Sequence, residues 1–180
     1  MGYYSSLIQR KFRDLVGSRY ESVRMEYSDF LASEEEMKIP PVNSILIPVD
    51  SFVEEIPDML IEVLKAYEAR IHLVYIIDLN VLDLIDEMVG EEMRSQYREK
   101  KEKFGRDMLR QLSGKLEGSG LKVQTQLFSG SKTEDVVRMS ESHDLLALYR
   151  GYGSQISDEQ PLSPDVSQIN HRVRHSVIIY

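Results

Sequence analysis

The sequence predicts an α/β fold: an open five-stranded parallel sheet with helices on both faces, preceded by an N-terminal helical extension. Three observations lead to this prediction. Short apolar runs recur along residues 43–180, two of them stop at an aspartate, and helical patterns separate them. Strands that are buried on both faces lack polar–apolar alternation, as most of these runs do. Because strands and helices alternate, the strands are expected to lie parallel.

Length and composition favour one domain with an appendage in a chain of 180 residues. No apolar run approaches the ~20 residues of a membrane span, and there is no cysteine, so we expect a cytoplasmic protein without a membrane partner. The net charge of -8 argues against nucleic acid as a partner. His171 and His175 have helical ligand spacing, but Arg172 and Arg174 crowd them, so no metal is expected.

Residues 1–42 are predicted to form a separate amphipathic helical extension with a linker, and residues 43–180 the domain. The apolar stripe of the extension consists of Ile8, Phe12, Val16, Tyr20, Val23, Tyr27 and Phe30. The acidic run Ser33–Glu36 and then Pro40 and Pro41 end the helix and form the linker. Two interpretations stay open: the helix packs within a dimer, which we favour, or it docks on another protein.

The first strand, Ile45–Val49, organises the domain because Asp50 follows it. Ligands of open α/β sheets bind at the carboxyl ends of strands, so Asp50 is expected to face a crevice there. Aspartate also caps helices and forms turns, and this simpler role for Asp50 remains open.

A helix with Pro57 in its first turn is predicted next, followed by a second strand, Ile71–Ile77, which ends at Asp78. Residues 81–116 are predicted to be helical, with an interruption at Gly90. The inward side chains of this segment are expected to be Met93, Tyr97, Phe104, Met108 and Leu112.

The third strand, Val123–Phe128, alternates in polarity, which is typical of an exposed edge strand. A helix from Gly130 leads to a fourth strand, Leu145–Tyr149, and a polar loop runs to Pro164. Asp165 is predicted to cap a short helix that ends at Val173, and Ser176–Tyr180 forms the fifth strand.

Five segments occur in the order typical of one family: Ile47–Asp50, Val74–Asp78, Gly130–Val137, Asp144–Leu148 and Val166–His175. Over residues 43–180 the chain resembles the universal stress protein family. The resemblance implies an adenine nucleotide alpha hydrolase-like sheet and a dimer that forms through the terminal strand Val177–Tyr180. It also implies a role in stress response.

The resemblance breaks down at the ATP phosphate-binding motif. Members that bind ATP carry Gly-x2-Gly-x9-Gly-Ser/Thr after the fourth strand, and this chain has Tyr149, Tyr152 and the pair Pro164-Asp165 at those places. Proline removes an N–H donor, and a carboxylate ~4 Å from a phosphate costs about 4 kcal/mol at an effective dielectric of 20. The sequence therefore predicts that the ATP mode is disabled.

Other positions of the family's nucleotide site do have matching residues here. The resemblance therefore implies a site that accommodates adenosine or an adenosine monophosphate but not ATP. The candidate cofactor-binding residues are Pro48, Val49, Asp50, Ile76, Arg150, Gly151, Gly153 and Ser167. Arg150 and Lys132 are the candidates for holding an anion.

No nucleophile–base pair, Walker loop or GxGxxG motif is found in the sequence. We therefore expect a non-catalytic, dimeric regulatory protein of the universal stress type, without a cofactor. The alternative is an adenine-nucleotide-binding member with a rebuilt phosphate loop and weak ATPase activity.

Overall fold

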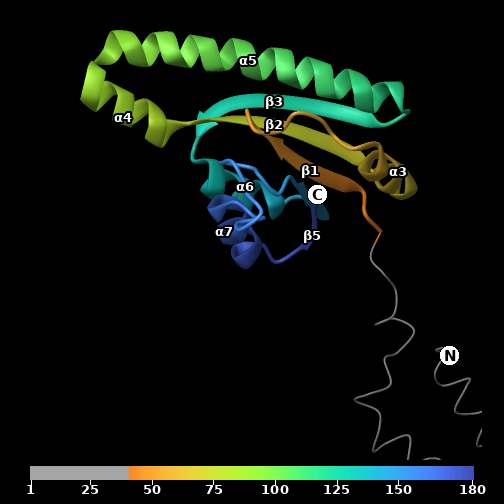
Figure 1. Cartoon of the computed structure of the whole chain (residues 1–180). Coiled ribbons are helices and arrows are strands. Elements are labelled where there is room, and N and C mark those ends of the chain that lie inside the picture. Colours follow the sequence, from red (N-terminus) through yellow and green to blue (C-terminus); the bar gives the residue numbers. More distant parts are fainter. Residues whose placement is uncertain (1–40) are drawn as a thin grey trace, which may run out of the picture. The chain divides into compact units, whose positions relative to one another are not determined.

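The computed structural model describes residues 41–180, whose arrangement is drawn in Figure 1. The described part contains one parallel sheet of five strands in the order β3-β2-β1-β4-β5. Its strands are β1 (Ser44–Val49), β2 (Arg70–Asp78), β3 (Lys122–Gly130), β4 (Leu145–Leu148) and β5 (Ser176–Ile179). The predicted fold class is confirmed for the domain. The helix predicted before it lies outside the described residues and stays a prediction.

Helices cover both faces of this sheet. They are α3 (Asp58–Tyr67), α4 (Leu79–Val89), α5 (Glu91–Gly118), α6 (Lys132–Ser140) and α7 (Pro164–Arg172). In Figure 1, α3 and α5 lie on one side of the strands, and α6 and α7 lie on the other. Gly90 separates α4 from α5 with a φ of 97°, so the predicted interruption is confirmed. None of the described helices is long and apolar enough to cross a bilayer.

Two apolar clusters hold the layers together, one on each face of β1. Ile45, Ile47 and Val49 belong to the cluster beneath α3 and α5, and Leu46 belongs to the cluster beneath α6 and α7. All four side chains are fully buried. This two-sided burial explains why the strand shows no alternation in its sequence.

The long helix α5 approaches the sheet closely at one glycine. A Cβ added at Gly105 would lie 2.6 Å from Cδ1 of Tyr75 and 2.7 Å from Cδ1 of Leu127. Glycine costs about 1 kcal/mol in a helix interior relative to alanine. Here it lets α5 rest directly on the side chains of β2 and β3.

The inward face predicted for α5 is wrong at Met93, and Phe104 faces the sheet, where its ring packs against Tyr75 of β2, but it is only partly covered. Met93 is 45% exposed and Phe104 is 43% exposed, whereas Leu112 is buried as expected. The helix instead buries Leu109 and Leu116 together with Leu112. In Figure 1 the α4–α5 corner extends past the carboxyl ends of the strands, so the first turns of α5 have no sheet beneath them.

The first turn of α7 also differs from the prediction. Ser163, not Asp165, is the N-cap, and its Oγ accepts a hydrogen bond from the N–H of Val166 at 3.1 Å. Pro164 explains the shift, because proline has no N–H and is preferred as the first helical residue after the cap. Asp165 then lies inside the first turn and accepts a hydrogen bond from Oγ1 of Thr133 at 3.2 Å.

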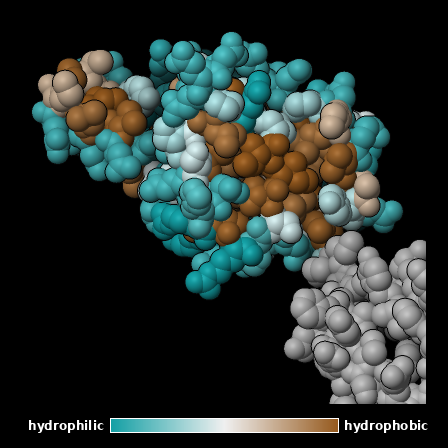
Figure 2. Space-filling view, turned by 60° about the horizontal axis from the view of Figure 1, so that its bottom comes forward, coloured by the Kyte–Doolittle hydropathy of each residue, from teal (hydrophilic) through white to brown (hydrophobic). Residues whose placement is uncertain are grey.

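Both predicted edge strands are edges, since β3 and β5 end the sheet order. At β5, the N–H of Tyr180 donates to the carbonyl of Leu148, and the carbonyl of Tyr180 accepts from the N–H of Arg150. Backbone groups alternate in direction along a strand, so the N–H and C=O of Ile179 point to the open side. Figure 2, which brings the lower part of Figure 1 forward, shows a broad hydrophobic area on this side.

Candidate functional site

Asp50 follows β1 and is only 1% exposed. Its Oδ1 accepts a hydrogen bond from the N–H of Phe52 at 3.0 Å, which closes a turn. Its Oδ2 accepts from Nζ of Lys132 and from the N–H of Gly153, both at 2.8 Å. The turn-forming role is therefore present, and the carboxylate also joins three segments that are distant in sequence.

Lys132 is the first residue of α6 and its side chain is 16% exposed. Its Nζ also lies 5.6 Å from the ring centroid of Tyr152, a cation–π distance. Burying an ion pair costs desolvation energy that good geometry and further hydrogen bonds offset, and Asp50 has both. Lys132 is thus committed to Asp50, whereas Arg150, its predicted companion in anion binding, is exposed.

The loop after β4 is held down by the side chain of Tyr152. This side chain is fully buried in the cluster beneath α6 and α7. Burial, aided by the charges of Asp50 and Asp165, raises the pKa of Tyr152 well above its ordinary value. Ser163 fixes the loop from the other side, because its hydroxyl donates to the carbonyl of Tyr152.

Gly153 lies between two carboxylates. Its N–H donates to Asp50, and a Cβ added to it would lie 1.8 Å from Oδ2 of Asp165. Its φ of 91° also favours glycine. The predicted phosphate motif places N–H groups of this loop on phosphates, but here the N–H of Gly153 binds Asp50 and the carboxylate of Asp165 is adjacent. The residues present do not fit a triphosphate.

A cleft of about 250 Å³ opens beside this cluster, at the carboxyl end of β2. Its lining includes Ser51 and Phe52 after β1, Ile76 and Asp78 of β2, Tyr97 and Lys101 of α5, and Lys132 and Gly153. Asp78 also caps α4, since its Oδ1 accepts from the N–H of Asn80 at 3.0 Å. The lining is mixed, because Phe52, Ile76 and Tyr97 contribute apolar surface and Ser51, Asp78, Lys101 and Lys132 contribute polar groups.

A comparison with curated proteins supports the family resemblance. A universal stress protein from Methanothermobacter thermautotrophicus is 23% identical over 128 residues, covering 71% of this chain and 87% of that protein. The resemblance to the universal stress protein family is confirmed. No family model matches the chain.

Solved structures show that the chain has the universal stress protein fold. Universal stress protein UspA from Lactobacillus plantarum aligns with a TM-score of 0.62 and 16% identity, covering 78% of this chain and 99% of that one. A universal stress protein in complex with cAMP aligns with a TM-score of 0.51 and 13% identity, covering 78% of this chain and 97% of that one.

The structure separates the cofactor-binding residues predicted from the universal stress protein resemblance. Ile76 and Gly153 line the cleft. The other six are Pro48, Val49, Asp50, Gly151, Ser167 and Arg150. The first four of these are buried, Ser167 is half-buried in α7, and Arg150 is exposed. Their role in binding a cofactor stays a prediction.

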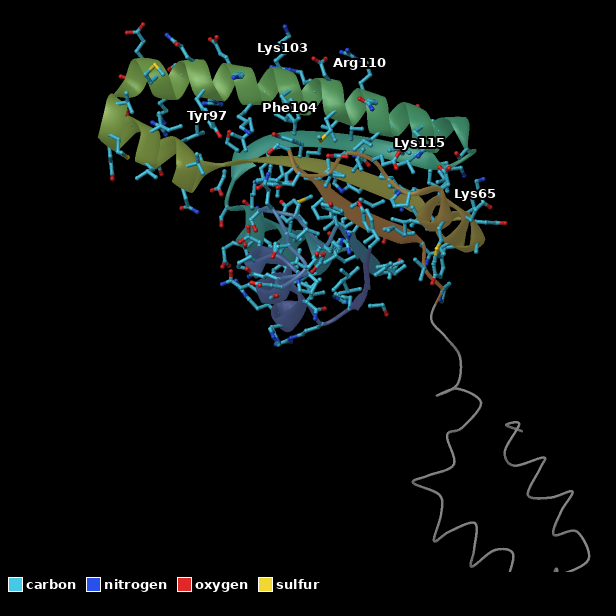
Figure 3. The ribbon with its side chains drawn as sticks, in the orientation of Figure 1. Lys65, Tyr97, Lys103, Phe104, Arg110 and Lys115 are labelled. Atoms are coloured by element: carbon cyan, nitrogen blue, oxygen red, sulfur yellow. The ribbon has the colours of Figure 1, made fainter. Side chains whose placement is uncertain are left out.

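Sequence reasoning missed the contribution of α5 to this cleft. Tyr97 and Phe104 lie on the sheet-facing side of the helix in Figure 3, and Lys101 lies over both rings. A signal was present in the sequence. Residues 97, 101 and 104 have i, i+4, i+7 spacing, so a lysine occupies a position of the apolar stripe where a core helix would have an aliphatic residue.

Proposed function

We propose that this protein is a non-catalytic, dimeric regulatory protein of the universal stress type that does not hold ATP at the loop after β4. The observation that carries this proposal is the position of Asp50 and Asp165 on either side of Gly153. A phosphate ~4 Å from one uncompensated carboxylate loses about 4 kcal/mol, which is nearly a thousandfold in affinity.

Lys132 neutralises the charge of Asp50, but this ion pair also supports the proposal that the loop does not hold ATP. A lysine that binds a buried carboxylate at 2.8 Å is not free to bind a phosphate. Releasing it would leave Asp50 buried without its counter-ion, which costs several kcal/mol. Any triphosphate in this loop would have to displace the ion pair as well as approach Asp165.

Two further features support the other parts of the proposal. The residues that line the cleft include no histidine or cysteine, and Asp78, the carboxylate among them, caps α4 through the N–H of Asn80. The backbone groups of Ile179 at the open edge of β5 favour a dimer, because an uncovered edge strand pairs readily with a second copy.

The test of the ATP proposal is a thermal shift measured with magnesium and ATP at millimolar concentration. We expect no shift in Tm, whereas a ligand at one hundred times its Kd would add about 2.7 kcal/mol of stability. Phosphate release above a blank without protein is measured in the same samples. A clear upward shift, or phosphate release that scales with protein concentration, would overturn the proposal.

A second candidate is an adenine nucleotide without a triphosphate. The cleft beside Ile76 extends from Gly153 of the crowded loop to Tyr97 and Lys101 of α5 and supports this candidate, as does the cAMP complex of the similar universal stress protein. Native mass spectrometry of freshly purified protein tests it directly. A co-purified mass of an adenosine monophosphate would favour it over a cofactor-free protein.

A further inference from the structure

The cleft at the end of β2 continues onto α5. A second cavity, of about 200 Å³, shares Ser51, Tyr97 and Lys101 with the cleft and adds Lys100 and Phe104. The two cavities are therefore neighbouring parts of one depression. Its inner end is at Gly153 and its outer end is on α5.

Most basic side chains of α5 form ion pairs, but among the described residues Lys100, Lys101 and Lys103 do not, and of these three only Lys100 and Lys101 line the depression. The paired ones are Arg94 with Asp83 and Asp86, Arg98 and Arg106 with Glu102, Arg110 with Asp107, and Lys115 with Asp58. No described carboxylate forms an ion pair with Lys100 or Lys101. Two unpaired ammonium groups thus line a hollow in a chain whose net charge is -8.

The aromatic side chains of the outer end are held in place and still open to solvent. Nζ of Lys101 lies 5.5 Å from the ring centroid of Tyr97 and 6.0 Å from that of Phe104. The Phe104 ring packs against the ring of Tyr75, with 6.2 Å between centroids, yet the residue is 43% exposed. Tyr97 lines both cavities, so a flat ligand in the cleft at the end of β2 meets its ring without rearranging it.

The two ends of the depression have opposite charge. At the inner end, Asp50 and Asp165 flank Gly153, and Lys132 is already paired. At the outer end, Lys100 and Lys101 are unpaired. An anionic ligand in the cleft therefore has its charge stabilised only when the anion faces α5.

We propose that this depression binds a nucleoside monophosphate with its phosphate on Lys100 and Lys101 and its ring in the cleft at the end of β2. This orientation is the reverse of one in which phosphates meet the loop after β4. The proposal rests on the second candidate function, and it adds the position and polarity of the ligand.

AMP, adenosine and inorganic phosphate are the probes, titrated by calorimetry into the full chain. We expect AMP to bind at least tenfold more tightly than adenosine, and phosphate alone to bind weakly. In the double variant Lys100→Gln/Lys101→Gln, AMP affinity falls to that of adenosine, while adenosine affinity is unchanged. Unchanged adenosine binding also shows that the variant is folded.

Lys103→Gln is the matched control. Lys103 lies on the same helix but points away from the sheet in Figure 3. This variant removes one positive charge from α5, half of what the double variant removes, so it measures the general electrostatic effect of one charge on the helix. We expect it to bind AMP as the unmodified chain does. An equal loss of AMP affinity in Lys103→Gln would overturn the proposal.

The remaining outcomes separate this inference from the proposed function. AMP binding that the double variant leaves unchanged, or no AMP binding at all, overturns the inference and leaves the absence of ATP binding intact. ATP binding that depends on Lys100 and Lys101 supports the inference and overturns the statement that ATP is not bound. ATP binding that does not depend on Lys100 and Lys101 overturns both the inference and the proposed function.

Discussion

At the scale of single residues, the ion pair of Asp50 and Lys132 is the contact most sensitive to substitution. Lys132→Met should lower the free energy of unfolding by about 3 kcal/mol, because it leaves a carboxylate that is 1% exposed without its counter-ion. Urea denaturation measures the loss. Lys65→Met is the control, since Lys65 pairs with Glu62 at the surface and should cost less than about 1 kcal/mol.

The double variant Asp50→Asn/Lys132→Met refines this test. Removing both charges should recover part of the unfolding free energy that Lys132→Met loses. The uncompensated carboxylate is then gone, while the amide of the asparagine still occupies its place. A double variant that loses the sum of the two single losses would show that the two side chains act independently. That result would contradict the role given to the pair.

Tyr152 gives a second prediction at this scale. Its hydroxyl is buried and has no hydrogen-bond partner among the described residues, so Tyr152→Phe should be neutral or raise stability by about 1 kcal/mol. Tyr152→Ala should lower it by about 3–5 kcal/mol, because it leaves a cavity beneath α6 and α7. Thermal unfolding of the two variants compares these effects. A large loss in Tyr152→Phe would reveal a partner for the hydroxyl.

At the scale of elements, β5 carries the prediction about assembly. Ile179→Pro should convert the proposed dimer to a monomer, because proline removes an N–H that points to the open edge and leaves the bonds between Tyr180 and β4 in place. Ile179→Ala is the control and should stay dimeric. Light scattering measures the mass. A dimer that persists in Ile179→Pro would place the interface elsewhere.

The elements also show how far sequence reasoning reached. Strand β1, the break at Gly90 and both edge strands followed from local patterns of polarity and glycine. The predicted Asp165 cap was wrong because Pro164 displaced it to Ser163, and the predicted inward position of Met93 was wrong because α5 extends past the sheet. Periodicity identifies one face of a helix, but it does not indicate where the neighbouring layer ends.

For the candidate site, sequence reasoning found the position and missed the partners. Asp50 was singled out because it follows a buried strand, and it does lie at the carboxyl end of β1. Its contact with Lys132 spans 82 positions along the chain, so no local pattern indicates it. Lys100 and Lys101 stand in a highly charged segment, where a lysine that lines a cavity has the same appearance as a solvated one.

At the scale of the whole molecule, a histidine pair should make stability depend on pH. Nδ1 of His72 on β2 lies 3.2 Å from Nε2 of His143, whose own Nδ1 donates to the carbonyl of Met139. Burial, and then the neighbouring His143, lowers the pKa of His72 from 6.5. The unfolded chain therefore binds this proton more tightly, so stability is complete above pH 6.5 and declines as the pH falls below it.

Urea denaturation between pH 7.5 and pH 5.5 measures this decline. We expect His72→Gln to flatten the curve, and His171→Gln, which changes an exposed histidine, to leave it as it was. Asp144 acts in a different range, because the N–H of Asn43 holds the pKa of its carboxyl below 3.8. The same decline in His72→Gln would contradict the assignment to His72.

The bond from the N–H of Gly153 to Asp50 also gives the molecule a spectroscopic reporter. An amide that donates to a buried carboxylate is shifted downfield in a proton–nitrogen correlation spectrum and exchanges slowly with solvent. That single resonance follows the loop after β4, the end of β1 and the start of α6 together. A ligand that opens the loop would move it upfield, whereas one that binds only at α5 would leave it in place.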